Sequence, residues 1–157
     1  MLYVILIIIA FFVYKIYKQK PKVVSKEEAM ENIQAEIERR EAALLNHLKT
    51  THLKDYMDTQ TVLFDCGKKN FLRLNERLKH DDVKRGEAIK DWIDYMEALN
   101  ESIYESELLD VSTSEESEIH WKARDEAHVK LQEINKRFKD LLGADFIDPA
   151  ELLAPKR

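Results

Sequence analysis

The chain has 157 residues, of which 35 % are charged and 45 % hydrophobic, whereas glycine and proline occur only three times each. This composition supplies a core but few turn residues, so it argues against disorder and against an all-β fold and favours long solvated helices in one domain. The single cysteine, Cys66, excludes an intramolecular disulfide and a zinc site built on several cysteines.

The charge is distributed unevenly along the chain. Residues 1–22 contain four lysines and no acidic residue, so residues 23–157 hold 21 basic and 30 acidic residues, a net charge of −9. Nucleic acid phosphates would repel such a body, because their binding requires a basic patch. We therefore expect no nucleic acid partner.

The first predicted element is an apolar helix over residues 1–20 that anchors the chain in a membrane. Residues 1–14 carry no charge, and Ile16 and Tyr17 extend the apolar run past Lys15. Residues 1–17 would form roughly 26 Å of helix, which is close to the ~30 Å of a hydrocarbon layer. The lipid bilayer is thus the partner expected for residues 1–17, and Pro21 ends the helix.

A cleaved signal peptide and a buried core helix are the two alternatives for this segment. The run lacks a basic start and the small residues of a cleavage site, and a core helix of this kind would need burial on every side. We therefore expect an uncleaved anchor. Because the lysines follow the run, the positive-inside rule predicts an outer N-terminus and a cytoplasmic body.

The body is predicted to begin after a linker at residues 21–25. Ser25 and Glu28 match a capping box for a first helix that runs to about residue 49, with a break at Thr50 and Thr51. Its apolar residues follow a helical spacing. They are Met30, Ile33, Ile37, Leu44 and Leu48.

A heptad-like seam predicts a second helix over residues 53–80. Gln60 and Gly67 are its two weak positions, so we expect one helix with a kink near residues 65–67, or else two shorter helices. The seam consists of Leu53, Met57, Gln60, Phe64, Gly67, Phe71, Leu74 and Leu78.

Two further helices follow. Asp81 and Asp82 can cap a third helix with the apolar stripe Val83, Ile89, Trp92, Ile93, Met96, Leu99 and Ile103. Either Ser112 with Glu115 or Thr113 with Glu116 can cap a fourth, whose stripe is Ile119, Ala123, Ala127, Leu131, Ile134, Phe138 and Leu141. Gly143 suits the end of this helix, and residues 144–157 are predicted to form a tail.

Four helical segments joined by short breaks predict an all-α fold. We expect a transmembrane helix followed by an antiparallel helical bundle of four helices over residues 26–143. A three-helix coiled coil with a fraying first helix is the alternative.

The sequence contains no convincing catalytic or cofactor motif. Residues 125–128 spell the Asp-Glu-Ala-His of helicase nucleotide sites, but no Gly-rich phosphate loop accompanies them and their context is helical. No Glu-x-x-His pair is present to build a metal site in a bundle. Cys66 has apolar neighbours, which suits a structural thiol. We therefore expect no catalytic residue, no metal and no cofactor, and a protein that is not an enzyme.

The most distinctive surface feature is an acidic run at residues 101–118 that contains no basic residue. It could be a solvated connection whose carboxylates stabilise the N-terminus of the fourth helix, or an electronegative edge that binds a basic protein partner. The candidate partner-binding residues are Glu101, Glu105, Glu107, Asp110, Glu115, Glu116 and Glu118.

These features favour a membrane-anchored, non-enzymatic interaction protein, such as an adaptor, an inhibitor or immunity-type protein, or a component of a membrane assembly. One alternative is a motif-less enzyme or a metal- or cofactor-binding bundle, which would need Asp125, His128 and other acids around one cavity. Another is a structural element that forms a homo-oligomer through the seam at residues 53–78.

Overall fold

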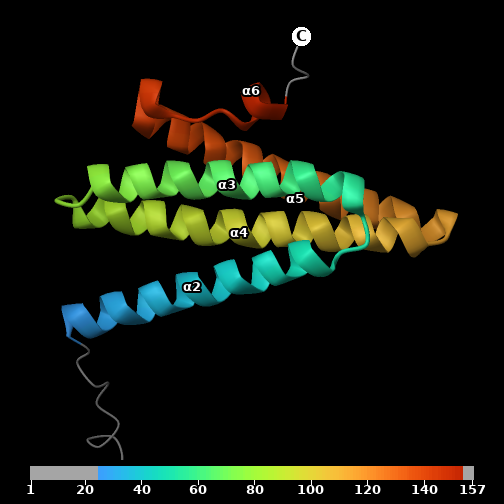
Figure 1. Ribbon diagram of the computed structural model, residues 1–157, viewed down its shortest axis with the longest axis horizontal. Helices are drawn as coiled ribbons and strands as arrows, with labels where there is room; N and C mark the ends of the chain where they lie inside the picture. The colour runs from blue at the N-terminus through green and yellow to red at the C-terminus, as the bar shows by residue number, and fades with distance from the viewer. Residues whose placement is uncertain (1–24, 154–157) are drawn as a thin grey trace, which may run out of the picture. The chain divides into compact units, whose positions relative to one another are not determined.

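The computed structural model describes residues 25–153, apart from the side chains of Lys54, Asp55 and Met57. These residues form helices and no strand, which confirms the all-α expectation (Figure 1). The membrane anchor predicted at residues 1–20 lies outside the described residues. Within residues 25–153, no helix combines the length and the hydropathy of a membrane span. The elements are α2 (Lys26–Thr50), α3 (Lys54–Arg77), α4 (Asp82–Val111), α5 (Ser114–Leu142), the 3₁₀ helix η1 (Gly143–Asp145) and α6 (Pro149–Leu153).

The helix boundaries agree with the capping signals of the sequence. The Ser25 hydroxyl accepts a hydrogen bond from the Glu28 backbone N–H (3.1 Å), and the Asp81 carboxylate accepts one from the Lys84 N–H (3.1 Å). Gly143 ends α5 with a φ of 59°, a conformation that glycine adopts without a steric cost. Local chemistry therefore determines where these helices start and stop.

The chain divides into two compact units, residues 1–35 and residues 36–157. The described part of the first unit is residues 25–35, which form the start of α2. In the second unit the rest of α2 contacts α4 and α3, through the ion pairs of Arg40 with Glu97 and of Glu41 with Lys68, and α3, α4 and α5 alternate in direction (Figure 1). Residues 36–50 bury Ile37, Leu44 and Leu48, so this part of α2 is a packed member of the bundle.

Helix α4 is the central element of the second unit. It contacts both α3 and α5, and on the side of α2 Glu97 forms an ion pair with Arg40. Because α4 has neighbours on three sides, its buried arc is wider than one apolar stripe. The residues that the stripe missed and that the structure buries are Ala88, Tyr95, Ala98, Ser102 and Ser106.

Three residues assigned to the apolar stripes are exposed. Val83 lies in the first turn of α4, and Ile119 lies near the start of α5, where fewer helices surround each face. At the end of α5, Leu142 takes the buried position and leaves Leu141 exposed. Periodicity marks the face of a helix correctly but does not show how far along the helix a neighbour covers it.

Helix α3 is continuous through residues 65–67, so neither the predicted kink nor two shorter helices are needed. Both weak positions of the seam, Gln60 and Gly67, are buried, as are Phe64, Phe71 and Leu74. Gly67 lies against the rings of Trp92 and Tyr95, which stack with centroids 5.6 Å apart. The glycine therefore permits a close approach of α4 rather than a bend in α3.

The segment after α5 folds back onto α3. The Asn70 side chain donates a hydrogen bond to the Ile147 carbonyl and accepts one from the Ile147 N–H, both at 2.9 Å. Arg77 donates to the Leu142 carbonyl (3.1 Å), and Arg73 donates to that of Asp145. These contacts hold Asp145 and Ile147 of the predicted tail, together with Leu142 at the end of α5, against α3.

Candidate functional site

The acidic run forms the turn between α4 and α5. Thr113 begins α5 in a capping box, in which its backbone N–H and hydroxyl both donate to the Glu116 carboxylate (3.2 and 2.9 Å). Of the two capping pairs that the sequence allows, the structure uses Thr113 with Glu116. Two long helices are thus joined by a two-residue connection and form a tight hairpin.

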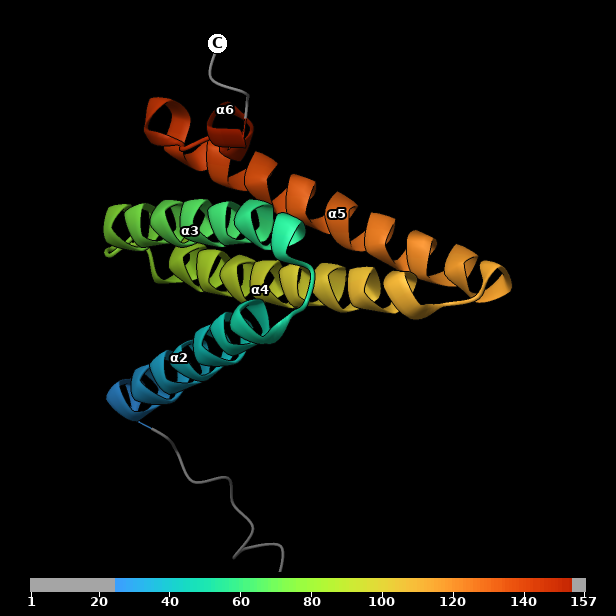
Figure 2. The same ribbon diagram turned by 45° about the vertical axis from the view of Figure 1, so that its right-hand side comes forward.

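The end of this hairpin extends past the start of α3 (Figure 2). The Tyr56 hydroxyl, in the first turn of α3, lies 2.7 Å from Ser102 Oγ in α4, so the residues of α4 beyond Ser102 lose this neighbour. We call residues 103–124 the hairpin end.

Large apolar side chains are exposed on the hairpin end. Their exposed fractions are 52 % for Tyr104, 74 % for Val111, 70 % for Ile119 and 49 % for Trp121. The Arg124 guanidinium lies over the Trp121 ring, 3.8 Å from its centroid. The four side chains belong to the same end of the hairpin as the acidic run, and exposed apolar side chains beside acidic ones can form an interaction surface.

The seven carboxylates of the run do not form one free edge. Glu105, Glu107 and Asp110 lie 2.7 to 3.1 Å from the imidazoles of His120, His47 and His52, respectively. Glu101 lies 3.6 Å from the Lys130 ammonium, and Glu116 caps α5. The side chains of Glu115 and Glu118 are exposed beside Ile119.

Sequence reasoning did not anticipate these histidine pairs. His47 lies in the last turn of α2, and its imidazole contacts Asn100 (2.7 Å) and Glu107 (3.1 Å) of α4. Burial alone would raise the pKa of Glu107, but hydrogen bonds from Thr51 and His47 outweigh this effect and lower the pKa. No local signal could reveal these pairs, because their members lie far apart in the sequence.

His128 belongs to a polar network inside the bundle. Its Nε2 lies 2.8 Å from Ser102 Oγ, which in turn contacts the Tyr56 hydroxyl. Burial, followed by the nearby Arg124 guanidinium, lowers the pKa of His128, and Asp125 opposes this shift only in part.

The lowered pKa of His128 predicts a loss of stability on acidification. In the unfolded chain the pKa of His128 should be near its usual value of about 6.5. At a pH between the folded-state and unfolded-state pKa values, the unfolded chain binds more protons than the folded chain. The unfolded state is therefore stabilised relative to the folded state as the pH falls. We expect His128→Gln to reduce the fall in Tm between about pH 7.5 and about pH 5.5, measured by circular dichroism. His80→Gln, which changes an exposed histidine, should retain the pH dependence of the original chain; equal pH dependence in H128Q and the original chain would contradict the assignment.

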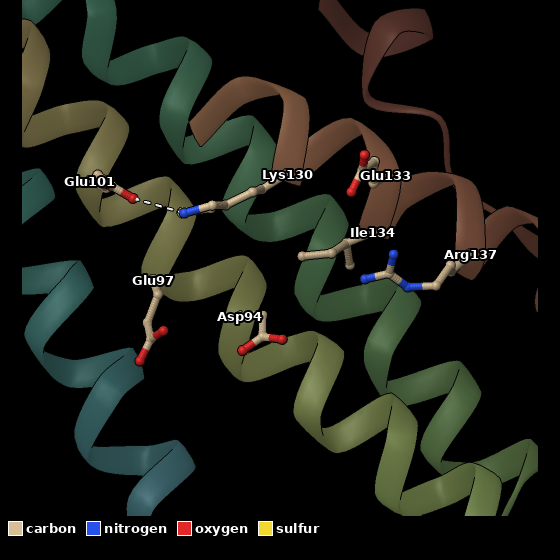
Figure 3. Close-up of a pocket in the computed structure, with 8 residues that line it drawn as sticks. Asp94, Glu97, Glu101, Lys130, Glu133, Ile134 and Arg137 are labelled. Carbon is tan, nitrogen blue, oxygen red and sulfur yellow. Dashed lines mark ion pairs between the residues drawn. The ribbon is translucent and has the colours of Figure 1, made fainter. Parts of the chain in front are cut away.

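A charged hollow of about 310 Å³ lies between α4 and α5 (Figure 3). Arg137 donates to both carboxylate oxygens of Asp91 (2.8 to 3.1 Å), and Lys130 reaches Glu101. Glu97 points towards α2, where it pairs with Arg40. Exposed pairs of this kind contribute about 0–1 kcal/mol each. The hollow is thus a solvated, largely paired face.

The residues singled out for chemistry are not brought together. The Asp125 side chain is exposed and lies outside the cavity that His128 lines, and Ala127 is buried in the core. Cys66 is buried, and burial raises the pKa of its thiol, which disfavours the reactive thiolate. Within residues 25–153, no three histidine, cysteine or acidic side chains lie close enough together to hold a metal ion.

Comparison of the chain with protein-family models, with curated proteins and with solved structures finds no significant match.

Proposed function

We propose that this protein is a membrane-tethered, non-enzymatic interaction protein whose hairpin end binds a basic partner with an apolar face. The observation that carries the proposal is the exposure of Tyr104, Val111, Ile119 and Trp121 on the hairpin end. Burial of one such side chain in an interface contributes about 1.5–3 kcal/mol. The surface therefore offers both affinity and, through its carboxylates, a preference for positive charge.

The preference for a basic partner follows from the acidic run. Residues 101–118 contain seven carboxylates and no basic residue, and Glu115 and Glu118 are exposed next to Ile119. A basic, amphipathic helix matches this combination, because its apolar side chains can cover the exposed rings while its lysines or arginines meet the carboxylates. An adaptor, an inhibitor or immunity-type protein, and a component of a membrane assembly would each use such a surface.

The tether is part of the proposal. An anchor at residues 1–20, with the body in the cytoplasm, would confine the hairpin end to the membrane surface and raise its effective concentration for a membrane-resident partner. Self-association through the seam at residues 53–78 is less favoured, because Gln60, Phe64, Phe71 and Leu74 of that seam are buried in the bundle.

The test uses the full chain in a neutral detergent and a fluorescein-labelled, helical peptide of lysine and leucine. We expect saturable binding by fluorescence anisotropy, and we expect a double variant, Ile119→Ser with Trp121→Ser, to weaken the affinity by at least about tenfold. Glu115→Gln with Glu118→Gln should weaken binding mainly at low salt, where charge attraction is least screened.

Matched controls lie elsewhere on the bundle. Leu72→Ser removes an exposed apolar residue of α3, and Glu126→Gln with Asp140→Asn removes two exposed carboxylates of α5. Both controls should bind the peptide as the original chain does. Equal affinity in the hairpin variants and the controls would rule out the hairpin end as the binding surface.

A further inference from the structure

A hollow of about 370 Å³ lies between α5 and the segment that follows it, away from the hairpin end. Helix α5 supplies one wall with Gln132, Asn135, Lys136 and Lys139. Residues at this spacing share one face of a helix, and the stripe from Gln132 to Lys139 is about 10 Å long. The volume of the hollow falls within the range of small-molecule sites.

The opposite wall is apolar and is attached to the bundle. Two hydrogen bonds between Asn70 and the Ile147 backbone connect the segment before α6 to α3. Leu153 of α6 remains 40 % exposed although it lines the hollow. The structure therefore presents an apolar wall that solvent, and hence a ligand, can reach. Its residues are Phe146, Pro149, Ala150 and Leu153, together with Leu63 of α3.

The charges of the lining do not cancel. The hollow is lined by two lysines, Lys136 and Lys139, and by one acidic residue, Asp148. Asp148 Oδ2 lies 3.5 Å from the Lys139 ammonium, and its Oδ1 accepts a hydrogen bond from the Ala150 N–H (3.0 Å), so both carboxylate oxygens have a partner. Lys136 is exposed and forms no ion pair with any residue in the range 25–153. One positive charge is thus left without a counter-charge.

A single free ammonium beside an apolar wall favours a ligand with one negative charge and an apolar body. A carboxylate can pair with Lys136 while the rest of the ligand covers Phe146 and Leu153. A phosphate monoester would bring a charge of about −1.5 to −2, of which part would lie uncompensated beside apolar side chains. The lining therefore selects a monocarboxylate.

We propose that this hollow binds a small organic monocarboxylate, in which one acid group is attached to an aryl or alkyl body. The carboxylate accepts hydrogen bonds from the Lys136 ammonium, and the body packs against Phe146 and Leu153. The site shares no residue with the hairpin end, so its test can succeed or fail independently of the proposed partner binding.

The test uses 3-phenylpropionate and two analogues that each lack one of its parts. In 3-phenylpropionamide a neutral amide replaces the carboxylate at nearly the same size, and propionate lacks the ring. The full chain, labelled at leucine methyl groups and held in phosphatidylcholine nanodiscs, is titrated with each compound and followed by nuclear magnetic resonance. We expect 3-phenylpropionate to shift the Leu63 and Leu153 methyl signals in a saturable manner. The amide should bind about three- to fivefold more weakly, and propionate at least about tenfold more weakly.

Two outcomes of this titration would overturn the proposal directly. One is the absence of a saturable shift at Leu63 and Leu153, and the other is an equal affinity for the acid and the amide. If the Leu153 signal broadened with protein concentration and the acid caused no shift, the apolar wall would belong to an interface with a second copy of the chain, which would also overturn the proposal.

Lys136→Gln tests the charge. The residue is exposed, so the variant should fold, and it should remove the preference for 3-phenylpropionate over the amide. Lys122→Gln changes an exposed lysine elsewhere on α5 and should retain the full preference. A full preference in K136Q would assign the charge selection to another group and contradict the proposal.

Two neighbouring leucines of α6 test the apolar wall. Leu153→Ser should weaken the binding of 3-phenylpropionate several-fold, measured at the Leu63 signal. Leu152 is 59 % exposed and is not among the residues that line the hollow, so Leu152→Ser should leave the affinity unchanged. Equal affinities in L153S and L152S would show that the ligand does not lie against this wall.

Discussion

Replacing Gly67 by alanine should destabilise the protein by about 1–3 kcal/mol, although alanine is the better helix former. A Cβ atom at this position would lie 2.5 Å from Tyr95 Cε1 and 3.0 Å from Trp92 Cζ3. Both rings are fully buried, and the Tyr95 hydroxyl is held by the Leu63 carbonyl, so neither ring can move aside without disrupting the core. The free energy of unfolding, measured with urea and far-ultraviolet circular dichroism, reports the effect.

Gly86 offers a matched control in the same bundle. It lies in α4, and a Cβ atom added there would meet no other atom within 4 Å. Gly86→Ala should therefore stabilise the protein by about 0.5–1 kcal/mol through helix propensity alone. Opposite signs for the two glycines are the expected result, and an increase in stability for G67A would show that α4 does not approach α3 as described.

Replacing Asn70 by alanine should have a comparable effect, a loss of about 2–3 kcal/mol, because it removes both hydrogen bonds to the Ile147 backbone. Asn70 is fully buried, so water does not readily take the place of its amide. The half-buried Ile147 N–H and carbonyl therefore lose their hydrogen-bond partner. Faster amide hydrogen exchange should be confined to residues 143–153, which the asparagine attaches to α3.

The control for Asn70 is Asn46, an exposed residue of α2. Asn46→Ala should change stability by no more than about 0.5 kcal/mol and leave the exchange of residues 143–153 unaltered. Unchanged exchange in N70A would mean that Arg73 and Arg77 alone hold this segment.

The sequence reveals only part of the candidate site. The acidic run at residues 101–118 is visible in composition alone, but of the exposed apolar side chains beside it Ile119 was predicted to be core, and Tyr104, Val111 and Trp121 were assigned to no stripe. Gln60 was recognised as a weak position of the seam, but a polar residue there gives no indication that the structure buries it as fully as Phe64.

The sequence by itself determined the helical class and, to within about a residue, where α2, α4 and α5 begin. Capping residues such as Ser25, Asp81 and Thr113 act on backbone groups only three residues away, and the apolar period follows from the geometry of a single helix, so both can be read locally.

Only the tertiary structure decided which carboxylates are paired, why Gly67 is needed and how wide the buried face of α4 is. His47 and Glu107 are 60 residues apart, and the ring that excludes a Cβ at Gly67 comes from another helix. These properties depend on neighbours that are brought together by folding, because packing and electrostatics act through space and not along the chain.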